Sequence, residues 1–192
     1  MIKIEIESNT GTHQQNEDYT ANLQLSDTCY AVAVADGMGG LENGEIASKT
    51  AVDTFNKYVQ AHYKDTEKQD CIHQALYEAD KAIANLIKEF KGRLGCSIAV
   101  AVISTTDMWY SWQGDVRIYL IRNKKPTQLT QDHNLDTGYE LRLTRCLKGN
   151  GLREDIPFKH HKLSEGDKIL ICTDGYYKHD DSDDSTTMTI TI

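Results

Sequence analysis

The chain of 192 residues lacks an excess of positive charge, a long hydrophobic run and paired cysteines. Its net charge of −8 argues against a nucleic-acid surface, because phosphate contacts need clustered Lys and Arg. No apolar run approaches the roughly 20 residues that a transmembrane helix needs. Residues 1–7 alternate in polarity and carry acids, which is not typical of a signal peptide. We therefore expect a cytoplasmic protein that binds neither nucleic acid nor a membrane.

The five cysteines exclude two further kinds of site. Their number is odd and they contain no CxxC pair, so neither a zinc site nor a disulfide framework is indicated. Cys29, Cys96 and Cys172 lie in apolar runs, which predicts reduced core residues. The 39% of hydrophobic and 26% of charged residues are ordinary for a soluble protein, and we interpret residues 1–192 as a single domain.

The hydrophobic pattern places two long helices between groups of strands. Helical periodicity covers residues 47–59 and 72–90, and residues 134–151 are predicted to be irregular or partly helical. Strands are predicted at 2–6, 19–25, 29–35, 95–103, 108–112, 116–122, 126–130, 158–163, 168–173 and 186–192. We expect 158–163 to pair with 168–173 around a turn at Ser164–Asp167. This grouping indicates an α+β fold with antiparallel sheets and helices packed on a sheet face.

The stretch from Val32 to Gly40 is the part of the sequence that most suggests chemistry. Four small apolar residues run into Asp36, three glycines follow within four positions, and a helical pattern starts near Glu42. A carboxylate at the exit of a buried strand, beside bare backbone, suits a hard cation that takes only oxygen ligands. The same stretch is equally consistent with a strand-turn-helix corner in which Asp36 caps the helix.

Other acidic residues share this kind of position next to an apolar strand. These residues are Glu17, Asp18, Asp115, Asp174, Asp183 and Asp184. Carboxylates gathered at one end of a sheet repel one another, so such a cluster needs cations. An all-oxygen ligand set favours magnesium or manganese over zinc. Two such ions about 3.5–4 Å apart would activate a water for attack on a phosphoryl group.

Six short motifs follow one another along the chain. They are Asn16-Glu17-Asp18, Asp36-Gly37-Met38-Gly39-Gly40, Gly114-Asp115-Val116-Arg117 with Tyr119-Leu120, Leu129-Thr130-Gln131-Asp132-His133, Leu143-Thr144-Arg145 and Thr173-Asp174-Gly175. In this order they resemble one known family, the metal-dependent (PPM, type 2C) Ser/Thr protein phosphatases of the bacterial type. The closing Asp183-Asp184-Ser185-Thr186 is similar to the family's final metal motif. Each motif alone is weakly specific, but together they span most of the chain.

The resemblance implies a four-layer α-β-β-α sandwich of two antiparallel sheets, with metals in a cleft at one end. It implies hydrolysis of phosphoserine and phosphothreonine by a metal-activated water at a binuclear centre, without a phosphoenzyme. Its partners would be phosphorylated proteins, such as a Ser/Thr kinase or the substrates of that kinase.

The resemblance also implies a role for each acidic residue. Asp36 would bridge both metals, and Glu17 with the Gly37 carbonyl would hold the second one. Asp18 would lie in the outer shell. Asp174 and Asp183 would complete the first metal, with Asp184 as the alternative to Asp183, and Asp115 would serve a third, weaker metal.

The sequence departs from the family at the position of the phosphate-binding Arg, where it has His13. A neutral His offers one donor, whereas Arg offers a permanent charge and a bidentate fork. We expect weaker phosphate binding unless His13 is protonated or another Lys or Arg reaches the site. Alternatively, the loop from Gly11 to Gln15 is displaced and the site is damaged.

Two segments are also shorter than in the family, which implies a minimal domain. Only residues 134–142 separate the fourth and fifth motifs, and only residues 176–182 separate Gly175 from Asp183. The first is the shortened flap, which predicts an open cleft. Two further functions stay open: a pseudophosphatase that binds phosphoproteins without turnover, and a hydrolase of small phosphate esters.

Overall fold

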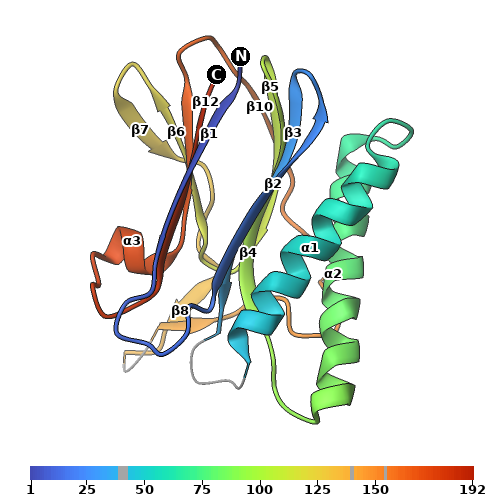
Figure 1. The fold of residues 1–192 in the computed structure, drawn as a ribbon, viewed down its shortest axis with the longest axis vertical. Coiled ribbons are helices and arrows are strands. Elements are labelled where there is room, and N and C mark those ends of the chain that lie inside the picture. Colours follow the sequence, from blue (N-terminus) through green and yellow to red (C-terminus); the bar gives the residue numbers. More distant parts are fainter. Residues whose placement is uncertain (39–42, 139–140, 154) are drawn as a thin grey trace.

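The computed structural model describes residues 1–38, 43–138, 141–153 and 155–192, which form two five-stranded sheets, a small hairpin and three helices (Figure 1). The first sheet has the strand order β1 (Lys3–Asn9), β12 (Ser185–Thr191), β11 (Lys168–Cys172), β6 (Arg117–Arg122) and β7 (Lys125–Gln128). The second has the order β10 (Lys159–Lys162), β5 (Asp107–Gln113), β4 (Cys96–Ser104), β3 (Cys29–Gly37) and β2 (Asp18–Ser26). The hairpin consists of β8 (Asn134–Asp136) and β9 (Leu141–Leu143), and the helices are α1 (Gly44–His62), α2 (Lys68–Phe90) and α3 (Asp174–Lys178). The strands of both sheets pair antiparallel, which confirms the predicted fold class. Gly39, Gly40 and the predicted helix start at Glu42 lie outside the described residues.

Strand β3 has a hydrophobic core on each face, which explains its uninterrupted apolar run. Ala31, Ala33 and Ala35 pack with residues of α1 and α2, whereas Val32 and Val34 pack with residues of the first sheet. Successive side chains of a strand point to opposite faces, so a shift by one residue would exchange the two sets. The register of β3 is therefore firmly fixed, and with it the position of the acidic residue that follows the run.

Helices α1 and α2 lie side by side against the outer face of the second sheet (Figure 1). The predicted stripe of α1 is fully buried: Ala47, Ala51, Phe55 and Val59. The stripe of α2 is buried as far as Ile83, but Phe90, which the pattern placed on it, is 45% exposed. Phe90 is the last residue of a helix whose end extends beyond the sheet (Figure 1).

The outer face of the first sheet carries far less helix than that of the second. Among the described residues its only helix is the short α3, which contacts β12 (Figure 1). The inner face is aliphatic, with Ile169, Ile171 and Met188 fully buried between the sheets. Outward positions of β12 hold threonines instead, which suits a sheet that faces water on one side. The fourth layer of the predicted sandwich is thus reduced to α3.

One local prediction was wrong, and another missed a short hairpin. Residues 158–163 and 168–173 do not pair: β10 pairs with β5 in the second sheet, whereas β11 lies between β12 and β6 in the first. The turn between them crosses from one sheet to the other, and Arg122 of β6 holds it by ion-pairing with Asp167 at 2.6 Å. Residues 134–151, expected to be irregular or partly helical, contain the β8–β9 hairpin.

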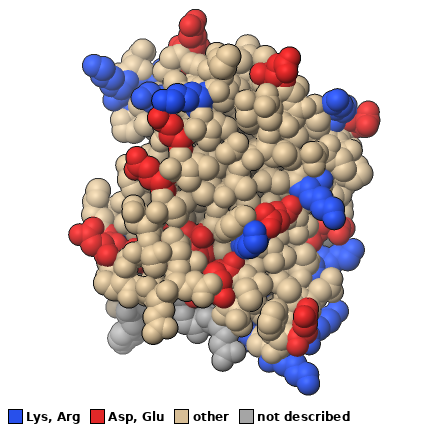
Figure 2. Space-filling model, viewed as in Figure 1, with Lys and Arg blue, Asp and Glu red and all other residues tan. Residues whose placement is uncertain are grey.

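The cysteine prediction is confirmed, because all five cysteines are free and four of them are buried. Among the described residues, no helix is long and apolar enough to cross a membrane. Figure 2 shows acidic and basic side chains interspersed over the coloured part of one face, so the net negative charge does not form one continuous surface there.

Candidate active site

The predicted acidic residues meet at one end of the two sheets because strand ends bring them there. Asp18 is the first residue of β2 and pairs directly with Asp36 near the end of β3. Asp115 lies in the turn between β5 and β6, and Asp174 begins α3 directly after β11. Asp183 and its neighbour lead into β12. Residues far apart in the sequence are thus gathered around one cleft.

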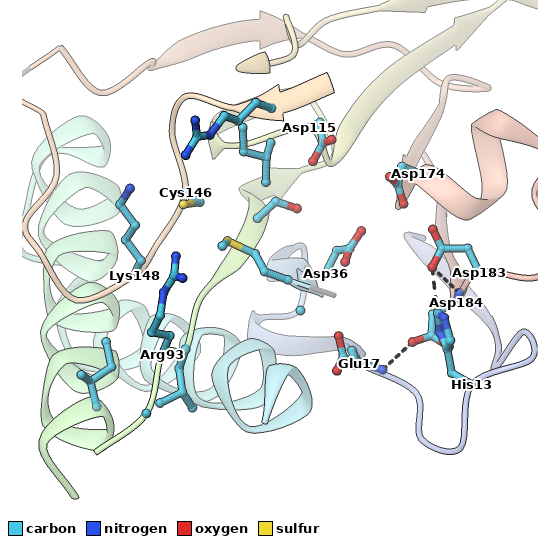
Figure 3. A pocket seen from close by; sticks show the side chains of 18 residues that line it. His13, Glu17, Asp36, Arg93, Asp115, Cys146, Lys148, Asp174, Asp183 and Asp184 are labelled. Carbon is cyan, nitrogen blue, oxygen red and sulfur yellow. Dashed lines mark hydrogen bonds and ion pairs between the residues drawn. The ribbon is translucent and has the colours of Figure 1, made fainter. Parts of the chain in front are cut away.

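This cleft has a volume of about 500 Å³, and six acidic side chains line it (Figure 3). They are Glu17, Asp36, Asp115, Asp174, Asp183 and Asp184, named here the acidic wall. Gly37 and His13 also line the cleft. Asp18 lies beneath it, is 7% exposed, and accepts a hydrogen bond of 2.8 Å from the Thr173 hydroxyl.

Burial and mutual repulsion disfavour charge on these carboxylates. Burial raises the pKa of Asp36 well above its usual range, and Asp18 and Asp174 raise it further. Burial raises the pKa of Asp18 to about 7 and that of Asp115 to about 6. The pKa of Glu17 is also raised, mainly by burial. Positive charge placed among these groups would relieve both effects.

Two carboxylate oxygens of the cluster lack the partner that a buried oxygen normally has. Asp18 Oδ1 and Asp184 Oδ1 are buried and accept no hydrogen bond from the described residues. A buried acceptor without a donor is costly, and a hard cation is one way to satisfy it. In the described ranges, however, no three acidic, His or Cys side chains converge closely enough to enclose an ion. The acidic wall is therefore an open, all-oxygen set that faces the cleft.

Two neighbouring contacts modify the acidic wall. Asp184 Oδ2 accepts a hydrogen bond of 2.7 Å from the Glu17 backbone N–H, which joins the segment before β2 to the segment before β12. Asp174 Oδ2 forms an ion pair of 2.5 Å with Lys178, one turn later on α3. Lys178 therefore already neutralises part of the charge at Asp174.

His13 lies beside the acidic wall on a loop that is held in place. Its Nδ1 is 3.6 Å from Asp184 Oδ1 and 4.0 Å from Asp183 Oδ1. Thr12 donates two hydrogen bonds, from its N–H and its hydroxyl, to the Ser182 carbonyl at 3.0 and 3.1 Å. A Cβ at Gly11 would come within 2.5 Å of that backbone. The loop is thus packed against the acidic wall, and His13 faces the cleft.

The turn that carries Asp115 is clamped from several sides. Gly114 has φ +108°, and a Cβ there would come within 2.3 Å of Ser97 Cβ. Its N–H donates to His133 Nδ1 at 3.2 Å, and the His133 N–H donates to its carbonyl at 2.9 Å. The Tyr177 hydroxyl donates to the Asp115 carbonyl at 3.1 Å. The motif that contains His133 therefore positions Asp115.

The cleft also has basic residues that the sequence analysis missed. Arg93 and Lys148 line the cleft and are named here the basic wall; Arg142 of β9 lines it as well. In Figure 3, Arg93 and Lys148 lie on the other side of Asp36 from His13 and Asp183. No periodic pattern or motif marks these positions in the sequence, because long-range contacts bring them to the cleft.

The comparisons with known proteins agree with this geometry. Residues 7–190 match the family described as "Protein phosphatase 2C", so the chain belongs to this family. A "Putative protein phosphatase" of Mycoplasma pneumoniae is 26% identical over 171 residues, which are 75% of this chain and 66% of that protein. The chain spans between 50% and 73% of the length of the curated relatives that it matches.

Solved structures show the same fold. The Ser/Thr phosphatase Stp1 from Staphylococcus aureus superposes with a TM-score of 0.84 at 17% identity, covering 100% of this chain and 95% of that one. The catalytic domain of the Ser/Thr protein phosphatase PstP, in complex with two manganese ions, has a TM-score of 0.79 at 20% identity, covering 99% and 97%. The two-sheet sandwich is thus the fold of the PPM phosphatases.

Proposed function

We propose that this chain is a metal-dependent phosphoprotein phosphatase that hydrolyses phosphoserine and phosphothreonine. The observation that carries the proposal is the acidic wall together with two buried carboxylate oxygens, Asp184 Oδ1 in the wall and Asp18 Oδ1 beneath the cleft, that accept no hydrogen bond from the described residues. Membership of the phosphatase 2C family and the two manganese ions of the related PstP structure support it. Phosphorylated proteins of the cytoplasm, such as a Ser/Thr kinase or its substrates, would be the natural partners.

The proposal gives the acidic wall the task of holding two manganese or magnesium ions. Asp36 lies centrally in Figure 3 and would bridge them, with Glu17 and the Gly37 carbonyl on one ion and Asp174 on the other. Asp183 would complete the set around the ion that Asp174 holds. Asp184 is the alternative, and its bond to the Glu17 N–H gives it a further task in orienting Glu17. Asp115 would hold a third ion, and Asp18 would support Asp36 from beneath.

The ions would neutralise the phosphoryl oxygens and lower the pKa of the attacking water. The protein's own part is to fix the positions of the carboxylates through the registers of β2, β3 and β12. His13 faces the same end of the cleft, and its ring can donate one hydrogen bond to a phosphate oxygen. As the water oxygen forms its bond to phosphorus and gives up a proton, the bond between phosphorus and the Ser or Thr oxygen would break, and that oxygen would take up a proton and leave as a hydroxyl group.

A second candidate function is phosphoprotein binding without turnover. Lys178 favours it, because its ion pair with Asp174 competes with a cation for that carboxylate. His13 favours it too, because it cannot supply the permanent charge of an Arg. The large acidic wall argues for the enzyme, since a binding module has no need of clustered carboxylates that repel one another. A hydrolase of small phosphate esters would use the same wall.

The test is hydrolysis of a phosphothreonine peptide by the purified chain with manganese, with magnesium and with a chelator. The proposal predicts phosphate release that needs a divalent metal and stops with the chelator. Binding of the peptide without phosphate release under any metal would favour the binding module instead. Release from 4-nitrophenyl phosphate alone, with none from peptides, would favour the small-ester hydrolase.

A further inference from the structure

The basic wall lies apart from the groups that the proposed hydrolysis needs. In Figure 3, Arg93 and Lys148 lie near Cys146, with Asp36 between them and the side of the cleft that holds Asp174. Both side chains are exposed, and neither forms an ion pair with another described residue. The cleft of a chain with net charge −8 thus holds two cations that no ion pair with a described carboxylate neutralises.

Buried neighbours and backbone hydrogen bonds hold the two segments that carry the cations, so the fold determines where the cations lie. Leu94, next to Arg93, is 1% exposed, and Leu147, next to Lys148, is fully buried. The two segments pair, because Cys96 and Leu147 exchange backbone hydrogen bonds of 2.9 Å in both directions. Arg93 and Lys148 therefore project from neighbouring, anchored segments.

A buried carboxylate holds the loop that begins at Lys148. Asp80 on α2 is 3% exposed and accepts three backbone N–H groups, from Lys148 at 2.9 Å and from Gly149 and Gly151 at 2.8 Å each. Gly149 has φ +69°, and a Cβ there would come within 2.6 Å of Ala84 Cα. The helix thus fixes the path of this loop, and the ammonium group of Lys148 is left at the cleft.

We propose that the basic wall binds a second anionic group of the substrate, next to the phosphorylated residue in the sequence of the peptide. This inference rests on the proposed function. The anion would be an Asp or Glu side chain or a second phosphate, since both are recognised by Lys and Arg. The wall does not serve the phosphate being hydrolysed, because it lies away from the side of the acidic wall where His13 faces the cleft. The positive charge of the basic wall also offsets the repulsion that the acidic wall exerts on an acidic substrate.

The test compares three phosphothreonine peptides: one flanked by alanines, one with glutamates on both sides, and one with a second phosphoserine nearby. The measured quantity is kcat/KM with manganese. For two exposed cations we expect the anion-flanked peptides to be preferred by about three- to tenfold, and less at high salt because exposed charges are screened. In the double variant R93Q/K148Q this preference falls to about one.

The matched control is K124Q/K125Q, which removes the same charge from exposed residues of the β6–β7 hairpin at the far end of the molecule (Figure 1). It should keep the preference. A wild-type preference of one, or a preference that survives R93Q/K148Q, would overturn the inference. An equal loss on all three peptides would do so too, because the cations would then hold the hydrolysed phosphate.

A binding measurement keeps this test independent of catalysis. Fluorescence anisotropy of the same peptides with Asp36→Asn reports discrimination without hydrolysis. If no peptide is hydrolysed, the proposed function fails, yet tighter binding of the anion-flanked peptides that disappears in R93Q/K148Q on this background would still support the basic wall. Equal binding of all three peptides would refute it. The two arms with glutamate and phosphoserine decide which anion is preferred.

Discussion

The acidic and the basic wall of the cleft carry opposite charges, and different parts of the fold hold them. The acidic wall consists of residues at strand ends, so the registers of two sheets fix it. The basic wall projects from loops, and one buried carboxylate on α2, Asp80, holds the backbone of the loop that begins at Lys148. Sheet ends suit a site whose groups must stay close despite repulsion. Anchored loops suit contacts that select among substrates.

The largest effect is expected from Asp36→Asn, which breaks the acidic wall at its centre. The amide keeps the shape but removes the charge that would hold two cations. We expect phosphopeptide hydrolysis to fall by at least about 10²-fold, as for the loss of one major electrostatic group in an active site. Phosphate release at saturating manganese measures it. Asp27→Asn, in the exposed β2–β3 turn, is the matched control, and equal rates for both variants would contradict the site.

Asp80→Ala removes the carboxylate that holds the loop beginning at Lys148 of the basic wall. Three backbone N–H groups of a partly buried loop lose their acceptor, so we expect the free energy of unfolding to fall by about 3 kcal/mol. Urea unfolding of the two proteins measures this difference. Asp53→Ala removes an exposed carboxylate that pairs with Lys49 on α1, and it should cost about 0.5 kcal/mol. Similar costs for both variants would show that Asp80 does not anchor the loop.

His133 holds the turn that carries Asp115 of the acidic wall, and its pKa makes the stability of the fold depend on pH. Burial, and then the nearby Arg145, lower the pKa of His133 from 6.5 to about 4, while Asp155 and Asp132 oppose this and Arg153 adds to it. At a pH between about 4 and 6.5, His133 binds a proton in the unfolded chain but not in the folded chain. Stability contributed by His133 is therefore lost as the pH falls from about 6.5 to 4.

We expect the free energy of unfolding of the wild type to fall by about 1–2 kcal/mol more over this range than that of His133→Gln, allowing for partial exposure of the ring. Thermal or urea unfolding at several pH values measures the two slopes. Parallel slopes would mean that the folded chain binds the proton as readily as the unfolded one.

His13→Arg sharpens the comparison by placing a permanent cation at the acidic side of the cleft. The guanidinium group can bind a phosphate through two hydrogen bonds, so KM for a phosphothreonine peptide should fall by about three- to tenfold. Steady-state kinetics separate this change from any change in kcat. His13→Gln keeps a neutral hydrogen-bond donor group without adding charge and is the matched control. An unchanged or raised KM in His13→Arg would show that position 13 does not face the phosphate.

The sequence analysis predicted that the carboxylates of the acidic wall gather at one place because the signal is local. Each carboxylate directly adjoins an apolar strand, and antiparallel pairing then brings residues such as Asp18 and Asp36 together. It also identified the two long helices, whose period of 3.6 residues is strong over many turns. The expected pairing of β10 with β11 failed for a physical reason: a polar turn of four residues can join two sheets as well as two neighbouring strands.

The basic wall could not be predicted because nothing local distinguishes it. Arg93 and Lys148 resemble any exposed Lys or Arg in the sequence. Their position depends on the backbone hydrogen bonds between Leu147 and Cys96, and on the hydrogen bond that the Lys148 N–H donates to Asp80 of α2. Such contacts join residues tens of positions apart, and a single sequence carries no record of them.

The most direct test of the central claim is a calorimetric titration of the chain with manganese chloride. The account predicts binding of at least two ions per chain, with the count reduced in Asp36→Asn and unchanged in Asp27→Asn. This measurement does not depend on the choice of peptide or on turnover. Absence of any binding by the wild type would contradict a metal centre at the acidic wall, and the proposed mechanism would fail with it.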